Sequence, residues 1–133
     1  MSVGFGISPN GKWSSVDGSD SGGFCSDALQ EYLLDYFTVD GIPVDPYDGG
    51  KFSGAQLDTL ARQLESAVAE VGAQQPDWPF YDDQKIAKYY AVCRVYGIEP
   101  LPPREQAIRE LRQAICLAVK ARKQNAFLVF YGD

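Results

Sequence analysis

The stretch Ala126-Phe127-Leu128-Val129-Phe130-Tyr131 decides the fold of this chain, because six consecutive apolar residues leave no polar face. A run of this length predicts a strand that is buried on both faces and needs a neighbour on each side. Residues 3–8 (Val-Gly-Phe-Gly-Ile-Ser) alternate large apolar side chains with small ones, which is the period of a strand. Their glycines leave the second face of that strand bare for a close contact. We therefore expect residues 126–131 to pair with residues 2–8.

A turn and a loop follow the first strand. Pro9-Asn10-Gly11 is a strong turn signal, and residues 12–16 are predicted to return as the second strand of an N-terminal β-hairpin. Residues 17–23 contain no large apolar side chain and are predicted to form a loop. Farther along, the turn-rich residues 38–50 connect two helices, with a short edge strand at Val39, Ile42 and Val44.

Four segments repeat apolar residues at helical spacing: 26–37, 53–72, 82–96 and 104–123. The second segment opens with a capping box of Ser53 and Gln56, and Gly72 closes it. The side chains expected to face the core are Leu29, Tyr32, Leu33, Tyr36 and Phe37, then Leu57, Leu60, Ala61, Leu64, Val68 and Val71, then Ile86, Tyr89, Tyr90, Cys93 and Tyr96, and finally Ile108, Leu111, Ile115, Ala118 and Val119.

These elements predict one α+β domain over residues 1–133. An N-terminal β-hairpin and a C-terminal strand form a small, mostly antiparallel sheet that packs against about four helices. The length of 133 residues and the hydrophobic share of 45% are those of a soluble domain with its own core. No stretch approaches the roughly 18 apolar residues of a membrane span, and the first residues do not have the pattern of a secretory signal.

The chain contains no histidine, which excludes the usual Ser-His-Asp, Cys-His and His-metal chemistries together. Its three cysteines, Cys25, Cys93 and Cys116, cannot all pair, and two of them fall in predicted helices. We therefore expect free thiols and a cytoplasmic location.

Three partial motifs point toward chemistry, but each lacks an essential part. Residues 6–12 have the spacing of a phosphate-binding loop, yet Trp13 stands where Ser or Thr would hold magnesium. Ser21, in the sequence Asp-Ser-Gly-Gly, has no histidine to act as its general base. A calcium loop beginning at Asp45 would have Tyr47 and Gln56 at ligand positions. We therefore expect no cofactor and no metal.

Charge is distributed unevenly along the sequence. Residues 1–83 hold 14 acidic and 3 basic residues, whereas residues 84–133 hold 4 acidic and 9 basic ones. Such asymmetry favours a cationic partner and disfavours nucleic acid, whose phosphates bind Lys and Arg. Ordinary solvation of an acidic surface explains the same numbers equally well.

The order of several segments resembles a known family. A Val3-Gly4-Phe5 strand precedes a Phe/Leu/Tyr-rich helix from Phe24 to Phe37, then come Tyr-Asp-Gly-Gly-Lys-Phe at 47–52 and a Leu-rich helix, and a Trp-Pro pair follows at 78–79. This order resembles the immunity protein 70 family of bacterial polymorphic-toxin systems over the first two-thirds of the chain. The resemblance implies a cytoplasmic, non-catalytic α+β protein that binds and neutralises a cognate toxin.

We therefore expect a toxin inhibitor whose partner is a toxin with a basic binding surface, without nucleic acid or membrane as ligands, and a monomer or weak dimer. The main alternative is an acidic secretion chaperone that binds an exported effector, and an enzyme that uses carboxylates alone stays open. An exposed apolar groove and an obligate dimer would favour the chaperone, whereas an acidic concave face would favour the inhibitor. Aromatic side chains outside helices and beside acids are typical anchors of a protein interface. The residues predicted to bind the partner are Trp13, Asp17, Asp20, Asp40, Asp45, Tyr47 and Asp48.

Overall fold

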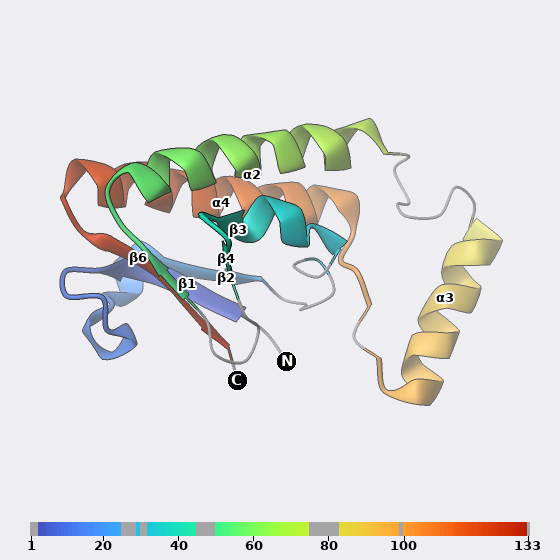
Figure 1. Ribbon diagram of the computed structural model, residues 1–133. Helices are drawn as coiled ribbons and strands as arrows, with labels where there is room; N and C mark the ends of the chain where they lie inside the picture. Colours follow the sequence, from blue (N-terminus) through green and yellow to red (C-terminus); the bar gives the residue numbers. More distant parts are fainter. Residues whose placement is uncertain are drawn as a thin grey trace.

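The computed structural model describes residues 3–24, 29, 32–44, 50–74, 83–98 and 100–132. Its centre is a four-stranded antiparallel sheet in the order β2-β1-β6-β5, formed by Ser21–Phe24, Val3–Ser8, Phe127–Gly132 and Gly50–Phe52 (Figure 1). Strand β6 pairs with β1 from Phe127↔Ser8 to Gly132↔Val3, and with β5 on its other side. The expected pairing of the apolar run with the first strand is therefore confirmed.

One face of this sheet fills the core. Phe5 and Phe130 lie opposite each other in the register of β1 and β6, with ring centroids 5.8 Å apart, and both are buried. Phe24 from β2 and Phe52 from β5 extend the same layer, so every strand contributes a phenylalanine ring to it. Stacked rings in tilted and edge-to-face arrangements contribute stability beyond their buried area.

The other face of the sheet is covered by the loop between β1 and β2. Trp13 stacks on Tyr131 with ring centroids 5.4 Å apart, and its ring edge lies against Gly4. Val16 packs so closely on Gly6 that a β-carbon there would lie 2.3 Å from Val16 Cγ1. The bare glycine face predicted from the alternation in β1 is therefore occupied by a close neighbour.

Two local predictions in this loop were wrong. Residues Trp13–Ser15 form a short 3-10 helix instead of a strand, and a second 3-10 helix follows at Gly18–Asp20. The returning strand is β2, in which residues 21–23 were predicted as loop and Phe24 was placed at the start of a helix by the family resemblance. Its Gly22 faces α4, where a β-carbon would lie 2.5 Å from the end of the flexible Gln113 side chain, and a β-carbon on Gly23 would lie 3.3 Å from the Val3 carbonyl oxygen.

Helices α2 (Ala55–Ala73) and α4 (Arg104–Lys123) lie side by side over the phenylalanine face of the sheet (Figure 1). The apolar stripe predicted for α2 is confirmed by its buried leucines and Val71, and the helix continues one residue past Gly72. The Ser53 N–H donates to Gln56 Oε1 at 3.3 Å, which is one half of the predicted capping box.

The buried face of α4 matches the prediction at Leu111 and Ala118 and differs from it elsewhere. It is a stripe of small residues, Ala107, Ala114, Ala118 and Ala121, together with Leu111. Small side chains allow a helix to approach its neighbours closely, so the larger Ile108 and Ile115 pack only at the margin of the core. Val119, which was predicted to face inward, is 43% exposed.

The segment before α2 was predicted as a helix over residues 26–37. Leu29 and Tyr32 are α-helical, whereas residues 26–28, 30 and 31 lie outside the described residues. Within its described residues, Leu34–Phe37 form a 3-10 helix that leads into a hairpin of β3 (Thr38–Val39) and β4 (Ile42–Pro43). Asp40 and Gly41 both have positive φ values, as a two-residue hairpin turn requires. Three α-helices lie wholly within the described residues, whereas the sequence predicted about four.

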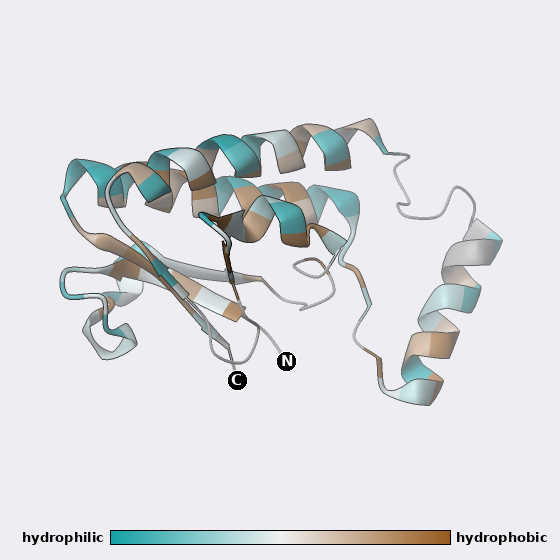
Figure 2. Ribbon diagram, viewed as in Figure 1, coloured by the Kyte–Doolittle hydropathy of each residue, from teal (hydrophilic) through white to brown (hydrophobic). Residues whose placement is uncertain are grey.

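Helix α3 (Asp83–Tyr96) stands apart from the layer of α2 and α4 (Figure 1). It is tied to the segment before α4 through Leu101, whose N–H donates to the Tyr89 hydroxyl at 3.2 Å and whose carbonyl accepts from the Tyr90 hydroxyl at 3.4 Å. Cys93 is buried, as expected, but Tyr96 is 73% exposed, which contradicts its predicted place in the core. Figure 2 shows hydrophobic turns on this helix although it lies outside the main body.

Two further findings bear on the sequence predictions. None of the helices among the described residues combines the length and apolar character needed to cross a lipid bilayer. Cys93 and Cys116 are free thiols, whereas Cys25 lies outside the described residues.

Candidate functional site

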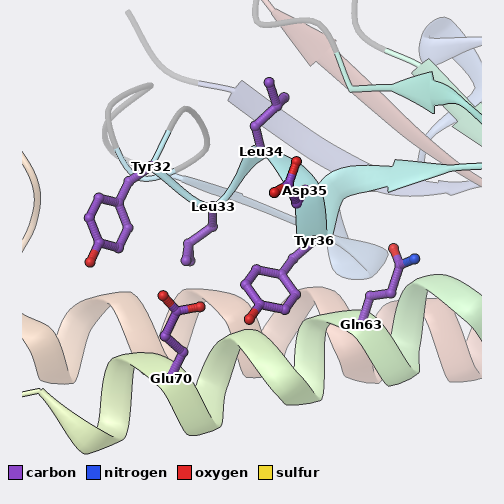
Figure 3. Close-up of a pocket in the computed structure, with 7 residues that line it drawn as sticks. All are labelled: Tyr32, Leu33, Leu34, Asp35, Tyr36, Gln63 and Glu70. Atoms are coloured by element: carbon purple, nitrogen blue, oxygen red, sulfur yellow. The ribbon is translucent and has the colours of Figure 1, made fainter.

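A concave cavity of about 680 Å³ opens between residues 32–37 and helix α2 (Figure 3). We call it the tyrosine groove. Tyr32, Leu33 and Tyr36 point from the segment toward α2, and Glu70 rises from the helix between the two rings (Figure 3). The groove is lined by Tyr32, Leu33, Leu34, Asp35, Tyr36, Gln63 and Glu70.

The groove is held in shape by contacts on both of its sides. Leu29, Leu33 and Phe37 are buried and anchor the segment in the core. Gln63 on α2, with its amide nitrogen facing the segment, donates to the carbonyls of Tyr36 and Thr38 at 3.1 and 3.0 Å. These contacts fix the position of the segment relative to α2, and the tyrosine rings form the walls of the groove between them.

The electrostatic character of the groove is negative. The Tyr36 hydroxyl donates to the Glu70 carboxylate, and this bond raises the pKa of Tyr36 above its usual value, with the negative charge of Asp35 adding to the effect. None of the described residues that line the groove is a lysine or an arginine. In the described part of the chain, neither Asp35 nor Glu70 forms an ion pair with a basic side chain.

Acids elsewhere on the molecule do have basic partners. Asp20 forms an ion pair with Lys120, and Asp58 Oδ2 lies 3.3 Å from Arg122 Nε. Both bases belong to the last turns of α4, so the acidic first part and the basic second part of the sequence meet in space. These ion pairs neutralise part of the charge asymmetry within the molecule. They do not involve the carboxylates of the tyrosine groove.

The predicted binding residues are only partly brought together. Asp17 and Asp20 line one cavity of about 370 Å³ beside residues 124–126. Asp17 is exposed and caps the second 3-10 helix, accepting from the Ser19 backbone N–H at 2.9 Å, and this bond together with the Ser19 hydroxyl lowers the pKa of Asp17. Asp20 is engaged by Lys120, as described above.

The remaining predicted residues have other surroundings. Trp13 is partly buried, and its ring covers the face of the sheet that is opposite the core. Asp40 lies in the β3–β4 turn, where its carboxylate accepts from Gln56 Nε2 at 3.4 Å. Asp45, Tyr47 and Asp48 lie outside the described residues, so their place in a binding surface stays a prediction.

Sequence reasoning missed the tyrosine groove because it assigned Tyr32 and Tyr36 to the core. Tyr32 is 44% exposed, and Tyr36 is only partly buried. A signal was present, since Leu29, Leu33 and Phe37 already fill one helical face. Tyr32 and Tyr36 lie beside that stripe, on either side of Asp35. A single helical face cannot bury these two rings as well as the three residues of the stripe.

The arrangement in the groove suits binding. Its groups are hydrogen-bond acceptors, phenol rings and an apolar floor, which together favour a cationic side chain. Within the ranges that the structure describes, no group of three or more Cys, Asp or Glu residues is placed to hold a metal ion. Comparisons with protein families, with curated proteins and with solved structures find no match for this chain.

Proposed function

We propose that this protein is a non-catalytic inhibitor that binds a cognate bacterial toxin directly and takes up a basic side chain of that toxin in the tyrosine groove. One observation carries the proposal: a concave site with two carboxylates and two phenol rings has no basic residue among the described residues that line it. A lysine or arginine from a partner would supply the missing charge. Charge-assisted hydrogen bonds and contacts with aromatic rings make such an anchor strong when the interface excludes water.

The groove and the predicted loop residues form two parts of this proposed interface. Asp45, Tyr47 and Asp48 belong to the turn-rich connection that follows the tyrosine segment in the chain. Acidic side chains around an anchor mainly accelerate the encounter with a basic partner, whereas a buried aromatic anchor prolongs the complex.

Growth rescue tests the proposal. The protein encoded by the gene next to this one is produced in bacterial cells, alone and together with this chain, and growth is followed. We expect toxicity without this chain and protection with it. Tyr32→Ala and Asp35→Lys should both reduce protection, because Tyr32 forms a wall of the groove and Asp35 supplies its charge.

Glu65→Lys is the matched control. Glu65 is exposed on α2, the helix that carries Glu70 of the groove, but it lines a different cavity together with Arg112. Asp45→Lys with Asp48→Lys, and separately Tyr47→Ala, test the predicted loop. Circular dichroism confirms that each variant is folded. Full protection by all groove and loop variants would place the interface elsewhere, and a harmless neighbouring protein would contradict the toxin assignment.

A secretion chaperone is the second candidate, and helix α3 is the observation that favours it. Val92, Val95 and Tyr96 are 50%, 78% and 73% exposed, which is an unusual amount of apolar surface on one short helix. A chaperone would use such a surface to hold an unfolded segment of an exported protein. Binding of an unfolded effector segment by this chain, together with failure of growth rescue, would select this function.

A further inference from the structure

The two faces of helix α3 have different environments. Tyr89, Tyr90 and Cys93 form the inner face, which is partly or fully buried and is tied to Leu101. The exposed side, which we call the α3 outer face, consists of Lys88, Val92, Val95 and Tyr96. These four residues follow the spacing i, i+4, i+7, i+8, which places them in one stripe along the helix. All four are exposed.

The α3 outer face carries one basic side chain, Lys88, beside its apolar residues. Between residues 83 and 96 the sequence holds Lys85, Lys88 and Arg94 against Asp83 alone, in a protein whose net charge is −6. An amphipathic helix of this kind binds by laying its apolar stripe into a groove, with anchors at successive turns. Its basic residues select a groove that is lined with acids.

The tyrosine groove has the complementary properties. Its rim carries Tyr32 and Leu34, which are 44% and 45% exposed, and Leu34 points away from α2 (Figure 3). Asp35 and Glu70 supply the negative charge. The α3 outer face and the tyrosine groove therefore both expose apolar surface, and their charges are of opposite sign.

We propose that a second copy of this chain covers the α3 outer face, and that the α3 outer face of each copy docks in the tyrosine groove of the other. Because α3 stands off the main body, it is placed to reach a neighbouring molecule (Figure 1). A twofold arrangement makes the same contact twice and closes the assembly at a dimer. This inference does not rest on the proposed toxin binding, although both use the groove.

Sedimentation velocity of the purified full chain over a wide concentration range tests the proposal. We expect a monomer–dimer equilibrium that shifts to the dimer as the concentration rises. Val95→Glu should raise the dissociation constant of the dimer by about tenfold or more, because it places a negative charge at the most exposed apolar position of the stripe. Val119→Glu, at an exposed apolar position on α4, is the matched control and should leave the equilibrium unchanged.

A charge exchange separates a direct contact from a general effect on folding. Lys88→Glu and Asp35→Lys should each weaken the dimer, and the double variant, which exchanges the two charges, should recover it at least in part. Monomers at every concentration, or a double variant that is as weak as the singles, would overturn the proposal. Val95→Glu leaves the groove intact, so loss of the dimer with unchanged growth rescue separates this inference from the proposed function.

Discussion

Substituting Gly6 with alanine tests whether the outer face of the sheet depends on close packing by the loop between β1 and β2. The added β-carbon would lie 2.3 Å from Val16 Cγ1, 3.1 Å from the Asp20 carbonyl oxygen and 3.2 Å from Ser21 Cβ. Ordinary carbon–carbon contacts are about 3.5–4.0 Å, so Val16 must move by roughly 1.5 Å. Because two of these neighbours are backbone or near-backbone atoms, the loop cannot simply turn one side chain away.

Overpacking of this kind destabilises the folded state by about 1–3 kcal/mol. Replacing a glycine with alanine offsets about 0.5 kcal/mol of this loss, because it lowers the conformational entropy of the unfolded chain. We therefore expect Gly6→Ala to lower the free energy of unfolding by about 1–2 kcal/mol. Urea denaturation followed by circular dichroism measures this change. Gly4→Ala is the matched control in the same strand, because its β-carbon meets only the edge of the Trp13 ring at 3.1 Å. It should change the free energy of unfolding by less than about 0.5 kcal/mol.

A double-mutant cycle with Val16→Ala identifies the cause. Removing Val16 Cγ1 makes room for the new methyl group, so the double variant should be more stable than Gly6→Ala alone. If Gly6→Ala is as stable as the native protein, or if Val16→Ala adds to the loss instead of offsetting it, the described packing of the loop on the sheet is wrong.

Three further predictions follow from the core, the groove and the thiols. Phe130→Ala, in the central strand, should lower the free energy of unfolding by about 3–5 kcal/mol in the same urea assay, and a loss below about 1 kcal/mol would contradict its burial. Ultraviolet titration should show a tyrosine that ionises above the usual range, and Glu70→Gln should lower the pKa of Tyr36 toward normal. Because the folded state retains that proton longer than the unfolded state does, the contribution of Tyr36 to stability should decline as the pH rises above about 10. Brief alkylation followed by peptide mapping should modify Cys116 in the folded protein and leave Cys93 protected until it unfolds.

The parts of the fold that depend on long apolar patterns could be predicted from the sequence. The run at residues 126–131 contains enough apolar surface that only a central strand can bury it, and the leucine stripe of α2 has a single helical face. Strand β2 could not be predicted in this way, because it has only one large apolar side chain, Phe24, and its neighbour Gln113 on α4 is far away in the sequence. Most of the alanine face of α4 was missed: Ala118 was predicted to face inward, but Ala107, Ala114 and Ala121 were not, because larger apolar residues dominate a helical pattern.

The candidate site was harder to predict than the fold. Counting charges along the sequence suggested one acidic side, but the ion pair between Asp20 and Lys120 shows that the fold cancels part of that charge. The tyrosine groove depends on Glu70 being opposite Tyr36, and these residues belong to different elements. A sequence pattern describes one element at a time, so it cannot show which acidic side chains form ion pairs with basic residues of another element.

The pairing of β1 with β6 also governs how the chain can fold as it is synthesised. Val3, Phe5 and Ile7 are made early, but the strand that covers their edge comes from residues 127–132. Until those residues leave the ribosome, the nascent chain holds an apolar strand with an open edge, which is a template for aggregation. Contacts that join such distant residues also slow folding, because the intervening chain must first be ordered. The inhibitor proposed here would therefore become functional only after translation has passed β6, and a toxin made at the same time would have a short interval in which it is unopposed.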